Sequence, residues 1–263
     1  MAATRAWAEL AFLEQVADAT YWMEFAAPEI AERAIPGQFV MIGVGLRGAT
    51  PPFLPRPMSV GSTLGGRLGL LVRVFGEGSR RLTQMRVGER ALLLGPLGTR
   101  FEPGSGRRIL CVAGGVGLAP FLYLPQWARA HRPEAEIRLL YGERRGAAIF
   151  RPARIREIAG LEPEIWSEDG SEGRRGKVTD QMELATADVV LACGPTAMLQ
   201  AVQSQAQHAG VPAQLSVEER MACGVGTCVG CVIAVDDGAG GRRYERVCVE
   251  GPVFPAERVR WSI

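Results

Sequence analysis

Cysteines gather near the end of this 263-residue chain, four of the six lying after residue 222. Cys223, Cys228 and Cys231 have the spacing C-x4-C-x2-C, and Cys248 follows after sixteen further residues. Thiolates at this spacing are used to hold a [2Fe–2S] cluster. The glycines at 224, 226 and 230 permit a positive φ and let backbone N–H groups approach the sulfurs. The pattern therefore predicts a [2Fe–2S] cluster bound by Cys223, Cys228, Cys231 and Cys248.

A structural zinc site with four cysteine ligands is the alternative for the same residues. Structural zinc sites commonly combine two short C-x2-C pairs, whereas only Cys228 and Cys231 form such a pair here. Cys248 is the least typical of the four, because it follows sooner than the fourth ligand of plant-type ferredoxins. The spacing favours iron and sulfide, and a non-catalytic zinc-binding interaction protein stays open as a different class of function.

Two stretches of the N-terminal part carry groups suited to a flavin dinucleotide. The sequence RPMS, Arg56 to Ser59, joins a short hydroxyl to an arginine, which makes forked hydrogen bonds to phosphate. Further along, Gly76, Gly78 and Ser79 precede a possible helix, whose first backbone N–H groups could bind a pyrophosphate. An exposed arginine in a turn is the alternative for either fragment. Their order along the chain favours an FAD site.

Two glycine loops follow predicted strands and suit a nicotinamide dinucleotide. GGVGLAP comes after the strand RRILCVA and opens a helix, and CGPTAML repeats this arrangement after another strand. Loops at the carboxyl ends of neighbouring parallel strands bind dinucleotide phosphates. The alternative is that the glycines only let each helix pack closely on its strand. We expect an NAD(H) site that includes Gly114, Gly115, Val116, Gly117, Cys193, Gly194 and Pro195.

A further carboxylate bears on the choice of nicotinamide cofactor. Glu168 and Asp169 follow the strand PEIW, where a carboxylate hydrogen-bonds a ribose diol and repels a 2′-phosphate. Arg174 and Arg175 argue for NADP instead, and a solvated turn is the structural alternative. We expect Asp169 to contact the cofactor and the cofactor to be NAD(H).

The pattern of strands and helices divides the chain into three parts. Residues 1–101 contain short strands between Pro and Gly clusters, typical of an antiparallel barrel. Residues 102–212 alternate strands with helices, which indicates a parallel sheet covered on both faces. Residues 213–263 are too few to bury a core of their own, and a metal would have to help them fold. The predicted fold class is multidomain, β plus α/β: an antiparallel FAD-binding β-barrel, a Rossmann-like NAD-binding domain and a small C-terminal [2Fe–2S] domain.

Composition limits the remaining possibilities. Net charge is +2, with 47% hydrophobic and 22% charged residues, which is typical of a folded soluble protein and gives no reason to expect nucleic acid as a partner. The first residues lack the long apolar stretch of a secretory signal, and the apolar residues 109–125 are interrupted by glycines and Pro120. We therefore expect a cytoplasmic protein without membrane contact. His131 and His208 stand in no metal or triad motif, and we expect no catalytic acid or base.

Together these motifs resemble the ferredoxin–NADP reductase superfamily over nearly the whole chain. RPMS is similar to its flavin motif, GGVGLAP to its nicotinamide loop and CGPTAM to its late Cys-Gly-Pro motif. More narrowly, DGSEGRRGKVTD and EERMACGVGTCVGC resemble the electron transfer subunits of type B dihydroorotate dehydrogenases. The resemblance implies ferredoxin-type ligation by the four cysteines. It also implies FAD contacts from Arg56, Pro57, Met58, Ser59, Leu71, Val72, Arg73, Gly78 and Ser79.

The resemblance also implies a function and a partner. Such subunits pair with an FMN-containing catalytic subunit, two of each forming a heterotetramer. Electrons pass from dihydroorotate through FMN, the cluster and FAD to NAD, in pyrimidine biosynthesis. NAD(H) exchanges two electrons as hydride with FAD, whereas the cluster carries them singly. A subunit of a sulfhydrogenase, or of a transhydrogenase that pairs NADH with ferredoxin, is the alternative within the superfamily.

Overall fold

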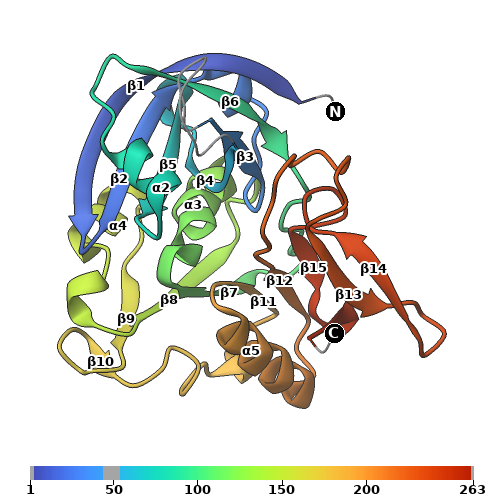
Figure 1. Ribbon diagram of the computed structural model, residues 1–263. Coiled ribbons are helices and arrows are strands. Elements are labelled where there is room, and N and C mark those ends of the chain that lie inside the picture. The colour runs from blue at the N-terminus through green and yellow to red at the C-terminus, as the bar shows by residue number, and fades with distance from the viewer. Residues whose placement is uncertain (1–2, 44–53, 262–263) are drawn as a thin grey trace.

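The computed structural model describes residues 3–43 and 54–261. Its strands form a closed six-stranded barrel, a seven-stranded sheet and a three-stranded sheet. Figure 1 shows the barrel, in blue to cyan, above the seven-stranded sheet, with the red C-terminal strands to one side. The predicted fold class, an antiparallel barrel followed by a parallel-sheet domain and a small C-terminal segment, is confirmed.

The barrel contains antiparallel strands in the order β1-β2-β5-β4-β3-β6. Successive side chains of a strand point to opposite faces, so buried and exposed positions alternate, most regularly in β6. The strands are β1 (Thr4–Ala17), β2 (Thr20–Ala26), β3 (Phe39–Ile42), β4 (Arg56–Ser62), β5 (Arg67–Arg73) and β6 (Arg90–Leu97). Two short helices, α1 (Pro28–Ala31) and α2 (Glu77–Thr83), connect them.

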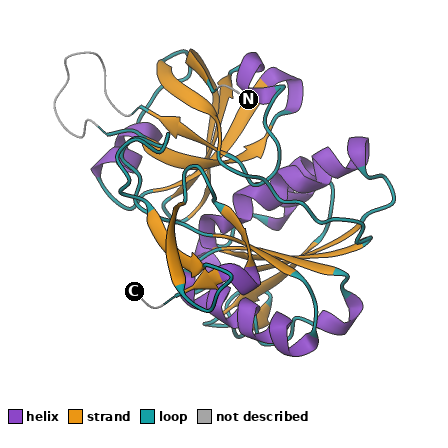
Figure 2. Ribbon diagram, turned by 90° about the vertical axis from the view of Figure 1, so that its right-hand side faces the viewer, coloured by secondary structure: helices purple, strands orange, loops and turns teal. Residues whose placement is uncertain are grey.

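The seven-stranded sheet has the order β10-β9-β8-β7-β11-β12-β15 and is parallel except at β15. Its strands are β7 (Arg108–Gly114), β8 (Glu136–Glu143), β9 (Pro163–Ser167), β10 (Arg174–Arg175), β11 (Val189–Cys193), β12 (Ala213–Ser216) and β15 (Val253–Pro255). Helices α3 (Ala119–His131) and α4 (Pro152–Ala159) pack on one face, and α5 (Thr196–Ala209) packs on the other. Figure 2 shows these layers edge-on. Gly210, in the left-handed conformation, ends α5 as the sequence predicts.

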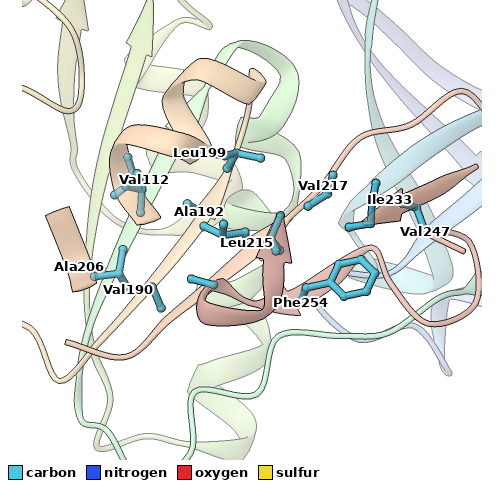
Figure 3. Packing of buried hydrophobic residues seen from close by; sticks show 14 of the residues in the cluster. Val112, Val190, Ala192, Leu199, Ala206, Leu215, Val217, Ile233, Val247 and Phe254 are labelled. Carbon is cyan, nitrogen blue, oxygen red and sulfur yellow. The ribbon is translucent and has the colours of Figure 1, made fainter. Parts of the chain in front are cut away.

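The C-terminal segment shares the hydrophobic core of the parallel sheet. Strands β13 (Val232–Asp236), β14 (Arg242–Arg246) and β16 (Val259–Arg260) form the three-stranded sheet. Its Ile233 and Val247 belong to the same buried cluster as Leu215 and Phe254, and Figure 3 shows these side chains in one continuous layer. A segment too small for a core of its own is therefore covered by its neighbour.

Two strands that follow the predicted boundary at residue 212 belong to the parallel sheet. β12 pairs with β11, and β15 pairs with β12. The division into 1–101, 102–212 and 213–263 stays a prediction about independent units. Within residues 3–43 and 54–261, no helix is both long and apolar enough to cross a membrane.

Candidate functional site

A cavity of about 800 Å³ lies where the barrel, the first glycine loop and the start of the C-terminal segment meet. Its volume is that of a site for a cofactor-sized ligand. The barrel wall contains the residues predicted to contact FAD, namely Arg56, Pro57, Met58, Ser59, Leu71, Arg73, Gly78 and Ser79. Val72 is the exception. Its side chain points to the opposite face of β5 from those of Leu71 and Arg73, and it is completely buried in the barrel core. The opposite wall is formed by Val116, Ala119 and the residues that follow β12.

The Arg56 side chain lies against the turn between β5 and α2. The Arg56 guanidinium lies over Gly78, where an added Cβ would come within 2.5 Å of Nε and Nη2. The Ser79 hydroxyl fixes this turn by accepting hydrogen bonds from the N–H groups of Phe75 at 2.9 Å and Gly76 at 3.2 Å. Any residue other than glycine at position 78 would place a Cβ where the Arg56 guanidinium now lies. An arginine beside a close-approaching backbone fits the pyrophosphate of FAD.

The two glycine loops contact each other at the carboxyl edge of the sheet. β7 and β11 are parallel neighbours, and a Cβ on Gly117 would lie 2.3 Å from the Cys193 carbonyl oxygen. Gly114 is equally enclosed, with the Met198 Sδ 2.7 Å from the position of a Cβ. Close packing therefore accounts for these two glycines. Val116 alone of the residues predicted to bind NAD(H) lines the cavity, and the assignment of the loops to NAD(H) stays a prediction.

Asp169 closes the turn after β9. Its carboxylate accepts hydrogen bonds from the Ser171 N–H at 3.0 Å, the Ser171 hydroxyl at 2.7 Å and the Gly146 N–H at 3.3 Å. The Ser171 hydrogen bonds lower the pKa of this carboxyl group. The turn lies beside the end of β8, on the edge where a ribose would be held. A contact with the ribose stays a prediction for a carboxylate that is already hydrogen-bonded.

The four C-terminal cysteines differ in their surroundings. The N–H groups of Cys228 and Val225 point at the Cys223 Sγ, at 3.4 and 3.5 Å, and these backbone hydrogen bonds lower the Cys223 pKa to about 6. Cys231 and Cys248 are buried, at 2% exposure each. Burial, together with the neighbouring Cys231, raises the pKa of Cys248 to about 12. Cys228 is exposed. The loop thus presents thiols with N–H groups directed at sulfur, which are the donors of an iron–sulfur site.

Backbone conformation shapes this loop in a way the sequence only partly indicates. Gly224 and Gly226 have φ of +71° and +82°, and a Cβ on Gly224 would lie 2.4 Å from the Met41 Cγ. Gly230 does not use the positive φ that glycine permits, and its neighbour Val229 has a φ of +55° instead. Nowhere in the described parts of the chain do three or more His, Cys, Asp or Glu side chains stand ready to hold a single metal ion.

The cysteine loop adjoins the cavity. Met221 lines the cavity two residues before Cys223. Beyond Cys223, Gly224 packs on Met41 of β3, which pairs with Pro57 of β4. One wall of the cavity continues into the cysteine loop. A flavin in the cavity and a cluster on the loop would therefore be neighbours.

Glu218 is a cavity residue that sequence reasoning missed. It follows β12, lines the cavity and is exposed there at the start of the charged run Glu218–Arg220. The surrounding walls displace enough water that burial raises its pKa above the usual 4.5. Cys193 is buried nearby, and burial followed by the Glu218 charge raises the pKa of its thiol. The residues EER look like an ordinary solvated charge run in the sequence, so no local signal marks Glu218.

Two family models match the chain. Residues 218–260 match the iron-sulfur cluster binding domain of dihydroorotate dehydrogenase B, and residues 111–204 match the oxidoreductase NAD-binding domain. The chain is 40% identical over 227 residues to the dihydroorotate dehydrogenase B (NAD(+)) electron transfer subunit of Caldanaerobacter subterraneus subsp. tengcongensis, covering 85% of this chain and 86% of that one. It belongs to this family of electron transfer subunits. A second member, from Desulforamulus reducens, is 36% identical and covers 94% and 95% of the two chains.

Two solved structures share the fold of this chain. An NADH-dependent reduced ferredoxin-NADP oxidoreductase structure superposes with a TM-score of 0.83 at 27% identity, covering 97% of this chain and 90% of that one. The FAD/NAD binding domain of a Vibrio cholerae nitric oxide dioxygenase shares the fold, with a TM-score of 0.65 at 18% identity. As a member of the dihydroorotate dehydrogenase B electron transfer family, the chain is an oxidoreductase subunit with an iron–sulfur and an NAD-binding domain. The match to an iron–sulfur domain counts against the zinc alternative.

Proposed function

We propose that this chain relays electrons between an FMN-containing dihydroorotate dehydrogenase subunit and NAD(H), through a [2Fe–2S] cluster and FAD, in pyrimidine biosynthesis. One observation carries the proposal: the wall of the flavin-sized cavity continues into the loop that bears Cys223, Cys228 and Cys231. When bound, FAD exchanges hydride with NAD(H) and single electrons with the cluster. The chain's task is to hold these groups next to each other.

Separate elements hold each group. Arg56 and the Gly78 turn would bind the FAD pyrophosphate, while Ser59 and Leu71 line the cavity deeper in the barrel. The four cysteines provide the cluster ligands, and backbone N–H groups directed at Cys223 stabilise its thiolate. The loops after β7 and β11 would receive the nicotinamide dinucleotide at the edge next to the cavity.

The two loops that carry the cysteines also carry exposed apolar side chains. Val225, Val229 and Val249 are 46%, 57% and 41% exposed, and all three belong to the two loops that carry cysteines. Exposed apolar side chains grouped at one site mark a protein contact. We propose that the FMN subunit covers this surface, in a cytoplasmic complex of two subunits of each kind.

A reconstitution experiment tests the proposal. The chain is purified under anaerobic conditions together with an FMN protein that oxidises dihydroorotate, and reduction of NAD⁺ is followed. We expect NAD⁺ reduction by dihydroorotate only when both proteins are present. If the chain is reduced by NADH yet never couples to dihydroorotate oxidation, the proposed partner is wrong.

The structural similarity favours one second candidate. The 27% identical ferredoxin-NADP oxidoreductase structure covers nearly the whole chain, so a transhydrogenase subunit that pairs NADH with ferredoxin is the alternative. Co-purification with a second pyridine-nucleotide flavoprotein in place of an FMN protein would support it.

A further inference from the structure

A largely buried ion pair joins the barrel to the parallel sheet. Arg73 ends β5 and Glu143 ends β8, and their side chains are 17% and 6% exposed. Arg73 Nη1 donates to Glu143 Oε2 at 3.2 Å, and Nη2 donates to Oε1. The two strands belong to different sheets. The pair therefore connects the part of the chain that would hold FAD with the part that would hold NAD(H).

Neighbouring groups fix both members of the pair. Arg73 Nε donates to the Thr20 hydroxyl at 2.9 Å. The Tyr141 hydroxyl donates to Glu143 Oε1 at 3.0 Å and itself accepts a hydrogen bond from the Phe150 N–H at 3.2 Å. Charges removed from water are stable only when paired and hydrogen-bonded. In this network every nitrogen of the Arg73 guanidinium donates a hydrogen bond to a protein group rather than to a phosphate.

The pair lies between the flavin cavity and the first glycine loop. Arg73 lines the cavity. Gly115 has a φ of +60°, and a Cβ there would lie 3.4 Å from Arg73 Nη1 and 3.9 Å from Glu143 Oε1. A movement of this pair would therefore change the shape of the cavity and the position of the loop after β7.

The position of the ion pair is important because hydride transfer depends on the distance between the two cofactor rings. Reacting atoms must approach to about 3–3.5 Å, and a misplacement of about 1 Å costs on the order of 100-fold in rate. The flavin and nicotinamide rings would be carried by different sheets, so contacts at the junction set their spacing. We propose that Glu143 is a positioning residue: by holding the Arg73 guanidinium, it fixes the spacing between the flavin and the nicotinamide. This inference rests on the proposed function, since it presumes FAD in the cavity and NAD(H) on the loops.

The Glu143→Gln variant tests the inference, because it keeps the size of the side chain and removes its charge. We expect the affinity of the flavin-free protein for FAD, measured by quenching of flavin fluorescence, to stay within about twofold. Reduction of bound FAD at saturating NADH, followed by stopped flow, should slow by about tenfold to 100-fold. The long-wavelength absorbance of NAD⁺ stacked on reduced flavin should be lost, which a general loss of stability would not produce.

Two further variants complete the test. Tyr141→Phe removes one hydrogen bond to Glu143 but keeps the ion pair, and we expect a severalfold slowing; it also serves if Glu143→Gln does not fold. Glu14→Gln is the matched control, because Glu14 pairs with Arg154 at 3.3 Å and with Arg151 across the same junction, but neither arginine lines the cavity as Arg73 does. It should keep the wild-type rate.

The outcomes separate the two claims. Wild-type reduction rates and wild-type stacking absorbance in both Glu143→Gln and Tyr141→Phe overturn the positioning role. Equal slowing in Glu14→Gln overturns it as well, because any junction contact would then suffice. If the wild-type protein itself binds no FAD or is not reduced by NADH, the proposed function fails and this inference fails with it.

Discussion

The contacts of an individual side chain in this protein cannot always be predicted from its residue type. Arg73 is implied as an FAD contact by resemblance, and it does line the cavity, but its guanidinium is taken up by Glu143 and Thr20. Glu143 lies 70 positions further along the chain, so no local pattern could have paired them. The four cysteines are the opposite case, since their spacing already favours an iron–sulfur site over a zinc site.

Glu218 gives a pH-dependent prediction at this scale. Its pKa is raised in the folded protein because burial disfavours the ionised carboxylate. The folded state therefore binds a proton more tightly than the unfolded state, and stability falls as pH rises from the unfolded pKa through the folded one. Glu218→Gln should raise the Tm of the flavin-free protein at pH 8 and change it little at pH 4.

A calorimetric or fluorescence melt at both pH values checks this. Glu219→Gln is the control for losing one negative charge on the same cavity wall. A Tm difference between Glu218→Gln and wild type that is the same at pH 4 and pH 8 would contradict the burial argument.

At the scale of elements, the long apolar strands and the helices could be predicted, and the proline-containing strands β4 and β6 could not. β1, β2 and β5 follow plain apolar runs, and α5 ends at Gly210 as expected. β4 and β6 contain Pro57 and Pro96, and proline and glycine count against a strand. Pairing within the closed barrel stabilises them there, because β4 pairs with β3 and β5, and β6 pairs with β3 and β1.

The contact between the two glycine loops gives a prediction at this scale. Gly117→Ala would place a Cβ 2.3 Å from the Cys193 carbonyl oxygen, which is backbone and cannot turn aside. We expect a loss of about 1–3 kcal/mol in the free energy of unfolding by urea. Gly76→Ala is the control, because no atom lies within 4 Å of its added Cβ and its φ of −170° is extended backbone. Equal stability of the two variants would show that the loops are not in this close contact.

For the whole molecule, the sequence predicts three successive parts but not how they share a core. The C-terminal segment was expected to need a metal to fold, whereas Ile233, Val235 and Val247 pack into the cluster that also contains Leu215. The metal requirement is untested, but the fold shows where the missing apolar contacts are supplied. A hydrophobic core shared between segments depends on contacts between residues far apart in the sequence, so local sequence patterns do not predict it.

Assembly gives the prediction that belongs to this scale. Val229→Asp would place a charge in the proposed contact with the FMN subunit, where an unpaired charge is costly. We expect affinity for that subunit, measured by titration calorimetry, to fall by about tenfold or more, with reduction of FAD by NADH unchanged. Val87→Asp, at 62% exposure on the barrel, is the matched control for Val229 at 57%. Equal effects of both variants would rule out a contact centred on the cysteine loop.

In the proposed electron path, four cysteines hold a [2Fe–2S] cluster beside a flavin in the adjoining cavity. The most direct measurement is iron, acid-labile sulfide and FAD analysis of anaerobically purified protein, with spectra before and after addition of NADH. We predict iron and sulfide in equal amounts with bound FAD, a flavin band bleached by NADH, and the paramagnetic signal of a reduced cluster. A protein that contains zinc but neither iron nor sulfide, or whose cluster stays oxidised while its flavin is reduced, would contradict the account.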